Sequence, residues 1–332
     1  MRSPPFESRP VSASERRSCI RGESMNIKDL QLFLTVVEEK NITQAAKRVG
    51  YTESGASHII KRLEKEIGFA LFARTRKGLI LTPNGEHILP YVRRIIMANE
   101  LFIEETSAIC GVLEGHISIG AYESIAIHWL PAALERFHKD FPNITVDIRE
   151  WRSDEIEAGL EEGSIDFGIT SPGRSGKMEW IPLKTDHYMA VCAPGSPFAE
   201  ESAFLLQRLE ETVCILPYHA DQDLYRCLSP MNIHPKQVFS ARNEFTMMAL
   251  VGQNLGISIL PELFLRGYQG NNVLLPLVPP IYRSLGILIP SMKDASPAAR
   301  RFLQYMQEAV DQIEGTTPPT CTLEYSTRRG EP

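Results

Sequence analysis

Residues 26–85 read NIKDLQLFLTVVEEKNITQAAKRVGYTESGASHIIKRLEKEIGFALFARTRKGLILTPNG. After a capping position at Asn26, four apolar residues recur at helical spacing: Leu30, Phe33, Leu34 and Val37. Asn41 begins a second, short helix, and Gly50 supplies the positive φ that a tight turn requires. Thr52 then caps a third helix. The stretch therefore predicts a helix-turn-helix.

The third helix has two different faces. Its buried stripe is expected to consist of Ala56, Ile59, Ile60 and Leu63. The opposite face carries Ser54, Ser57, His58 and Lys61. Hydroxyl, imidazole and ammonium groups can reach base edges and phosphates from the major groove. A solvated face is the ordinary alternative for one polar stripe, but its place after a helix–Gly–helix unit favours DNA recognition.

A basic turn follows the third helix. Arg74, Arg76 and Lys77 stand between Phe72 and the apolar run 79–81. Two short strands around such a tip would form a wing that lies along the DNA backbone or minor groove. A solvated hairpin tip is the alternative, and the position directly after the recognition helix favours the wing.

The run from Leu30 to Gly85 resembles the LysR-type transcriptional regulators. The matching motifs are Ala45-Ala46, Ser57 with Arg62-Leu63-Glu64, Leu71-Phe72 with Arg74, and Leu81-Thr82 with Gly85. The resemblance implies a set of residues for DNA contact: Thr43, Gln44, Thr52, Glu53, Ser54, Ser57, His58, Lys61, Arg62, Arg74, Arg76 and Lys77. Two positions depart from the family. Glu53 replaces a common Gln, and Gly55 replaces a common Ala. We therefore expect an operator sequence that differs from those of better-known members of the family.

A long helix is predicted for the linker, residues 83–114. Its apolar seam has alternating steps of four and three, with two polar interruptions: Ile88, Val92, Ile95, Asn99, Phe102, Thr106, Ile109 and Leu113. This apolar seam could pack against the helix's own domain. Its period of nearly 3.5 residues favours packing against a partner helix instead. The resemblance implies dimerisation here, further assembly to a tetramer, and a roughly palindromic site. Pro90 predicts a kink near the start.

Residues 115–314 change to alternating strands and helices, which predicts βαβ units, a mostly parallel sheet and two lobes. The family resemblance continues in Ile119-Gly120, Leu130-Pro131, Phe141-Pro142, 166–169, 255–257 and Leu260-Pro261. The expected fold class is therefore α/β: an all-α winged helix-turn-helix with a linker helix, then a two-lobed sensor domain similar to periplasmic solute-binding proteins.

An effector pocket is expected where helices follow the carboxyl ends of the strands. This rule selects Tyr122, Glu123, Ser124, Thr170, Ser171, Tyr218, His219 and Asn243. Ser124, Thr170 and Asn243 also fall on positions that resemble the family's effector pocket. For each residue alone, a helix cap or a surface loop explains it equally well. Trp151 is expected either to wall the pocket or to lie in the core.

Composition bounds the remaining possibilities. The net charge is −6, yet residues 25–82 hold ten Lys and Arg against six Asp and Glu. This basic segment favours binding of a polyanion at that end of the chain. Segments 1–24 and 315–332 are expected to be disordered. The partners we expect are double-stranded promoter DNA, a second copy of the chain, a small-molecule effector and RNA polymerase. The sequence contains no apolar run long enough to predict a membrane span, so we expect a cytoplasmic protein.

Other functions fit less well. The six cysteines form no CxxC pair, and the histidines show no metal-ligand spacing, so neither metal nor cofactor is expected. No catalytic motif is present, so we do not expect an enzyme. A redox-sensing regulator that uses Cys214 and Cys227 remains an alternative, although a structural thiol is the better interpretation of Cys214. A transport-type solute-binding protein would not carry the basic head.

Overall fold

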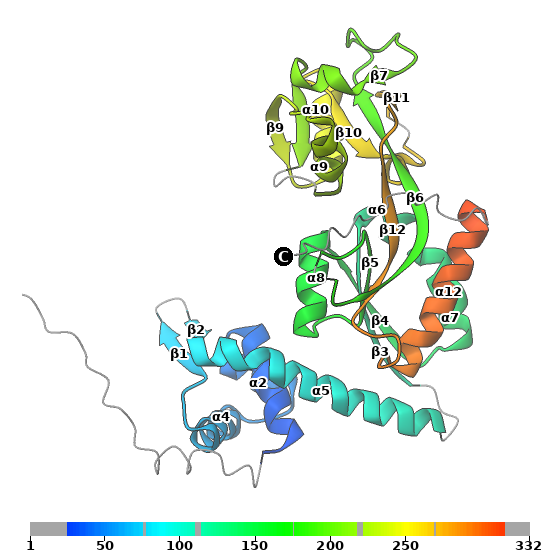
Figure 1. Cartoon of the computed structure of the whole chain (residues 1–332). Coiled ribbons are helices and arrows are strands. Elements are labelled where there is room, and N and C mark those ends of the chain that lie inside the picture. Colours follow the sequence, from blue (N-terminus) through cyan, green and yellow to red (C-terminus); the bar gives the residue numbers. More distant parts are fainter. Residues whose placement is uncertain are drawn as a thin grey trace, which may run out of the picture. The chain divides into compact units, whose positions relative to one another are not determined.

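The computed structural model describes residues 25–75, 78–109, 114–174, 176–217, 222–268 and 270–315 (Figure 1). The chain forms two compact units, one up to Ile103 and the other from Glu104. The predictions of disorder for 1–24 and for the tail after Gly315 lie outside the described residues, as do those for Arg76, Lys77, Tyr218 and His219.

Three helices and a hairpin form the head: α2 (Ile27–Glu39), α3 (Ile42–Arg48), α4 (Glu53–Ile67), β1 (Phe72–Thr75) and β2 (Gly78–Leu81). Asn26, Asn41 and Thr52 accept hydrogen bonds from the first turns of the three helices. Gly50 has φ +75°, as the turn requires. The predicted winged helix-turn-helix is confirmed.

The buried face of α2 differs from the predicted stripe. Leu32 and Val36 are fully buried with Leu30 and Phe33, whereas Leu34 and Val37 are only half-buried. Spacings of i+3 and i+4 both fit a helix, so two adjacent stripes were compatible with the sequence. Arg74 was also placed in the turn, but it lies on β1 opposite Leu79.

The linker forms a single helix, α5 (Pro83–Ile109), which contains Pro90. Val92 and Ile96 are buried in the core of the head, and Ile88 and Leu89 pack beside them. Tyr91, Ile95 and Phe102 are instead exposed. The predicted seam is thus divided between the head's own core and an exposed apolar face.

The first lobe of the body is a parallel sheet with helices on it. Its strands are β3 (Gly115–Ala121), β4 (Ile144–Glu150) and β5 (Phe167–Thr170), and its helices are α6 (Glu123–His128), α7 (Leu130–Asp140), α8 (Ser153–Glu162) and α12 (Pro297–Glu314). A core of aliphatic and aromatic residues, with Trp129, Phe137 and Phe302 fully buried, fills the space between the sheet and α7 and α12.

The second lobe is smaller and has more short elements. These are β7 (Phe204–Leu205), β8 (Cys214–Pro217), α9 (Gln222–Leu228), β9 (Gln237–Ala241), α10 (Glu244–Gly252), β10 (Ser258–Pro261), α11 (Glu262–Leu265) and β11 (Val273–Val278), with 3₁₀ turns at Leu206–Glu210 and Ser229–Met231. β8 and β9 pair in parallel, and β8 packs against α10 and β10.

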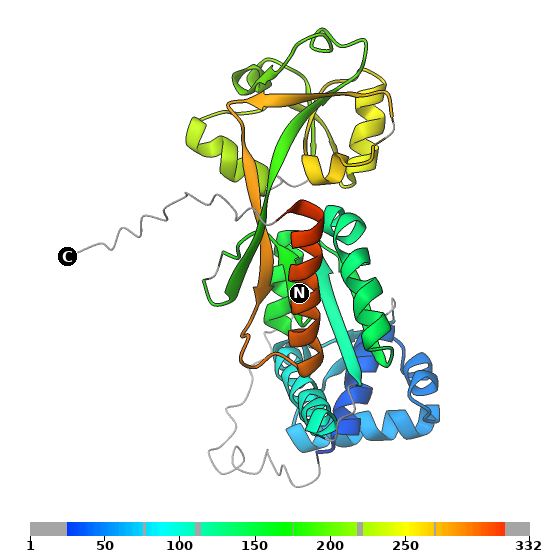
Figure 2. The same ribbon diagram turned by 90° about the vertical axis from the view of Figure 1, so that its right-hand side faces the viewer.

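Two long strands, β6 (Glu179–Cys192) and β12 (Tyr282–Ile289), connect the lobes (Figures 1 and 2). They pair antiparallel along the whole of β12, and β12 is also antiparallel to β5. The sheet order is β4-β3-β5-β12-β6-β11-β7. The two-lobed α/β fold is confirmed. The prediction of a mostly parallel sheet was wrong, because β12 runs antiparallel to β5 and β6, and β10 and β11 run antiparallel to β6.

Candidate functional site

The polar face of α4 is held outward by its buried face. Ala56, Ile60 and Leu63 pack against the other helices of the head. Ser54, His58 and Lys61 are exposed on the other side, and Ser57 is half-buried. Glu53 is exposed in the first turn. The structure thus places these side chains on one accessible helix face.

Gly55 contributes to the cap of this helix. Its backbone N–H donates to Thr52 Oγ1 at 3.1 Å. A Cβ at position 55 would approach that hydroxyl to 3.0 Å, which is tighter than an ordinary contact. An alanine at position 55 would therefore require the Thr52 side chain to shift by a few tenths of an ångström.

Two side chains fix α4 to its neighbours. Arg62 donates to the buried carboxylate of Asp29 on α2 at 2.6 Å, and this bond and charge raise the pKa of Arg62. Glu64 Oε1 accepts from the backbone N–H groups of Leu71 and Phe72 at 2.7 and 3.2 Å. Arg62 thus anchors the recognition helix, and Glu64 sets the start of the hairpin relative to it.

The remaining candidates for DNA contact lie around this face. Thr43 and Gln44 stand in the first turn of α3, where their N–H groups donate to Asn41 Oδ1. Arg74 is exposed on β1. The fold therefore brings the first turn of α3, the face of α4 and the hairpin together in one domain.

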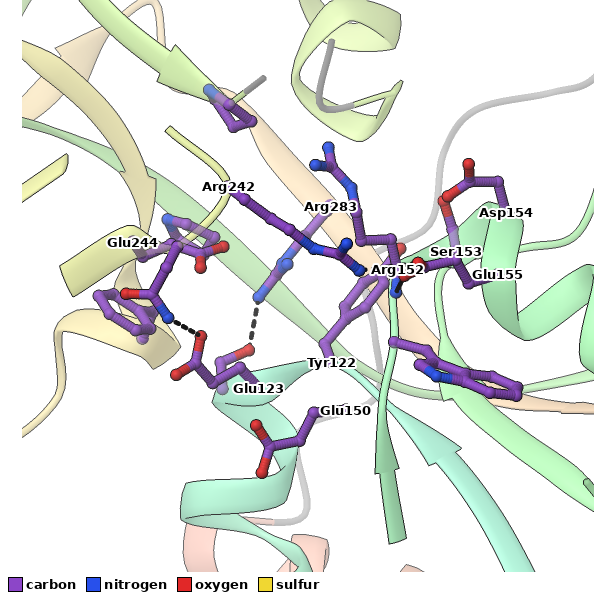
Figure 3. Close-up of a pocket in the computed structure, with 16 residues that line it drawn as sticks. Tyr122, Glu123, Glu150, Arg152, Ser153, Asp154, Glu155, Arg242, Glu244 and Arg283 are labelled. Carbon is purple, nitrogen blue, oxygen red and sulfur yellow. Dashed lines mark hydrogen bonds and ion pairs between the residues drawn. The ribbon is translucent and has the colours of Figure 1, made fainter. Parts of the chain in front are cut away.

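A cavity of about 280 Å³ lies between the two lobes (Figure 3). Its walls come from α6, the loop after β4, the start of α8, the segment before α10, and β12. The lining residues are Tyr122, Glu123, Ser124, Glu150, Trp151, Arg152, Ser153, Asp154, Glu155, Pro217, Arg242, Asn243, Glu244, Pro261, Phe264 and Arg283. Trp151 is thus a wall of the cavity, half-buried beneath the guanidinium of Arg149.

Arg283 is the central charged group of this region. Its Nε donates to Asp186 Oδ2 at 2.9 Å, and its Nη2 donates to Ser124 Oγ at 2.9 Å. The guanidinium also stands 5.0 Å from the ring centre of Tyr122. Asp186 additionally accepts from the N–H of Leu263 at 2.9 Å. Both members of the ion pair are buried. Arg283 connects β12 to β6 and to the start of α6, and Asp186 connects β6 to α11.

A second polar contact joins the lobes beside the cavity. Asp223 of α9 accepts hydrogen bonds from the hydroxyls of Tyr122, at 2.8 Å, and of Ser171. Burial, and then the charge of Asp223, raise the pKa of Tyr122, which stays a neutral donor. Thr170 is completely buried next to Ser171.

The predicted effector residues therefore separate into two groups. Tyr122, Glu123, Ser124 and Asn243 line the cavity, whereas Thr170 and Ser171 are not part of its lining. Asn243 caps α10 by accepting from Phe245 and Thr246 N–H, and its Nδ2 donates to Glu123 at 3.5 Å.

Sequence reasoning missed the arginines and most of the carboxylates of the cavity. Arg283 lies on a strand 159 residues from its partner Ser124. Arg242 donates to Glu155 of the other lobe at 2.8 Å. Glu244 follows the predicted Asn243 directly, so the rule that selected Asn243 could have included it.

The thiols of the body are in protected surroundings. Cys214 is completely buried, its Sγ lies within hydrogen-bonding distance of the carbonyls of Leu209 and Thr212, and burial raises its pKa to about 12. Cys192 is also buried, and Cys227 donates to the carbonyl of Tyr282 at 3.2 Å. Cys214 therefore lacks the thiolate character of a peroxide-reactive cysteine.

The described residues contain neither a metal-binding cluster nor a membrane-spanning helix. Within those residues, no group of three or more His, Cys, Asp or Glu side chains could hold a metal ion. No helix of that part of the chain is both long and apolar enough to cross a membrane.

Sequence comparisons agree with both halves of the fold. Residues 27–86 match the "Bacterial regulatory helix-turn-helix protein, lysR family", and residues 111–311 match the "LysR substrate binding domain". The HTH-type transcriptional regulator YvbU of Bacillus subtilis strain 168 is 29% identical over 291 residues, which cover 86% of this chain and 98% of that protein.

Solved structures show the same fold. A full-length OxyR variant from Pseudomonas aeruginosa has a TM-score of 0.70 at 20% identity, over 89% of this chain and 97% of that one. CbnR in complex with its target DNA has a TM-score of 0.62 at 20% identity, over 86% and 100%. With both domain profiles matched in order, the chain belongs to the LysR family of DNA-binding transcriptional regulators.

Proposed function

We propose that this regulator reads its operator with the exposed face of α4 in the major groove. The observation that carries the proposal is that face itself, Ser54, Ser57, His58 and Lys61, opposite a buried stripe. Hydroxyl and ammonium groups at this spacing suit base edges and phosphates. Arg74 and the hairpin would contact the backbone beside it, and CbnR, a protein of the same fold, has been solved on its target DNA.

The cavity between the lobes is the proposed effector site. A small molecule bound there contacts both lobes at once, so it changes the equilibrium between their arrangements if it binds those arrangements unequally. The response is then a change in the affinity or spacing of DNA contacts. The proposal includes a cytoplasmic location, no catalytic step and no cofactor, with RNA polymerase as a further partner.

A thermal-shift screen of the full chain against metabolites tests the effector site, because a true ligand raises the melting temperature by mass action. Ser153→Phe would fill the cavity and is expected to abolish the shift. Ser202→Phe, at an exposed serine of the same domain, is the control. A hit whose shift survives Ser153→Phe would place the effector elsewhere. A cavity ligand must also alter retardation of promoter DNA by the chain.

We propose dimerisation through the exposed face of α5. Ile95 is 44% exposed, whereas Val92 and Ile96 pack into the head. Ile95→Asp is expected to dissociate the dimer, because it would bury a charge in an apolar helix interface. Light scattering coupled to size-exclusion chromatography measures the mass. Ile80→Asp, a similarly exposed isoleucine on β2, should leave the assembly intact. A dimer that survives Ile95→Asp would refute this interface.

The redox-sensing alternative predicts that peroxide changes DNA binding, whereas we expect peroxide to leave DNA binding unchanged. Because burial raises the pKa of Cys214 to about 12, the group remains a thiol at neutral pH. We expect DNA affinity to be unchanged by millimolar hydrogen peroxide, and Cys214 to resist alkylation in the folded chain while reacting in denaturant. A loss or gain of DNA binding on oxidation, absent from Cys214→Ser, would establish redox sensing instead.

A further inference from the structure

The charges around the lobe cavity are unequal. Five carboxylates line it, Glu123, Glu150, Asp154, Glu155 and Glu244, against three guanidiniums, Arg152, Arg242 and Arg283. Arg283 is paired with the buried Asp186, and Arg242 is paired with Glu155 across the lobes. The lining of the cavity therefore carries a net negative formal charge.

Two of the lining carboxyl groups come from different lobes and lie close enough to interact. Glu123 begins α6, and Glu244 begins α10. Burial, and then the charge and contact of Glu123, raise the pKa of Glu244. Among the described residues, no ion pair joins either carboxyl group to a Lys, Arg or His, although the charge of Arg283 acts to lower the pKa of Glu244. Their positions on the cavity wall are visible in Figure 3.

The groups around this pair disfavour an anionic ligand. The N–H groups of Phe245 and Thr246, in the first turn of α10, donate to Asn243 Oδ1 and are not available to an anion. The guanidinium of Arg283 already has two partners. A carboxylate placed near Glu123 and Glu244 would meet like charge in a half-buried site.

We propose that the effector is a small organic cation whose protonated amine binds between Glu123 and Glu244. An ammonium group there replaces the repulsion between two carboxylates with attraction to both, so it favours the arrangement that brings α6 and α10 together. Phe264, Pro217 and Pro261 offer apolar surface for the carbon skeleton. The cavity volume of about 280 Å³ limits the ligand to a small molecule. The inference rests on the proposed effector role of this cavity.

Titration calorimetry with skeleton-matched probes tests the charge preference. The probes are primary amines from propylamine to hexylamine and benzylamine, each paired with the carboxylate of the same skeleton. We expect amines to bind the full chain at least 10-fold more tightly than their carboxylate counterparts. Glu123→Gln with Glu244→Gln should weaken amine binding by 10-fold or more, and Glu123→Asp with Glu244→Asp should retain most of it. Glu200→Gln, exposed and outside the cavity lining, is the control.

Three results would overturn the inference. These are tighter binding of the carboxylates than of the amines, equal amine affinity in the wild type and the double Gln variant, or no amine binding at millimolar concentration. The double Gln variant removes a like-charge contact, so a melting temperature equal to or above that of the wild type is expected and shows that it folds. A carboxylate that binds the cavity and alters DNA retardation would leave the effector role standing while the amine assignment fails. Failure of the unliganded chain to bind DNA would instead reject the proposed function.

Discussion

Replacing Arg283 with leucine is expected to lower the free energy of unfolding by about 3–5 kcal/mol, because it leaves the buried carboxylate of Asp186 without its cation. The side chains of Arg283 and Asp186 are only 7% and 6% exposed, so solvent screens the pair little. The change also removes the donor to Ser124 Oγ and the cation over the Tyr122 ring. Urea unfolding of the full chain, followed by circular dichroism, measures the effect.

Two further variants make this result specific to the ion pair. Arg301→Leu, on the exposed face of α12, should change stability by less than about 0.5 kcal/mol. Adding Asp186→Asn to Arg283→Leu removes the unpaired charge while it keeps an acceptor for the N–H of Leu263, so part of the loss should be recovered. A loss below about 1 kcal/mol for Arg283→Leu, or no recovery in the double variant, would contradict the role given to the pair.

The Ser57→Ala and Lys61→Ala double variant is expected to lose specific operator binding. Each base or phosphate contact from the recognition helix is worth about 1–3 kcal/mol, so losing both weakens binding on the order of 10²–10⁴-fold. Neither residue belongs to the buried stripe of α4, and the fold should therefore be unaffected. Fluorescence anisotropy at fixed salt measures the affinity, since salt alone changes it strongly.

The matched control is Lys28→Ala, which removes the same charge from the exposed start of α2. It should weaken binding far less than the double variant. Unchanged operator affinity in Ser57→Ala with Lys61→Ala would show that α4 does not read the DNA.

The head was largely predictable from the sequence because its signals are local. Caps at Asn41 and Thr52, a positive φ at Gly50 and one apolar stripe per helix each depend on residues within a few positions. The ambiguity between two adjacent stripes on α2 arose because the buried face is set by contacts with distant residues, such as that of Asp29 with Arg62 on α4.

The body was predictable in architecture but not in its connecting strands. β6 runs from a mostly half-buried first half to a largely buried second half as it passes between the lobes, so no single hydrophobic period marks it. Asn243 and Glu123 were found because they follow strand ends. Arg283 could not be found that way, since its partners Asp186 and Ser124 lie 97 and 159 residues away.

Selection from a random-sequence DNA library by the purified full chain tests most directly whether this protein is a sequence-specific regulator that reads DNA with α4. A dimer with two recognition helices predicts one enriched motif with two-fold related half-sites. The Ser57→Ala and Lys61→Ala variant should fail to enrich that motif. No enriched motif with the wild-type chain, or the same motif enriched equally by the variant, would contradict the account.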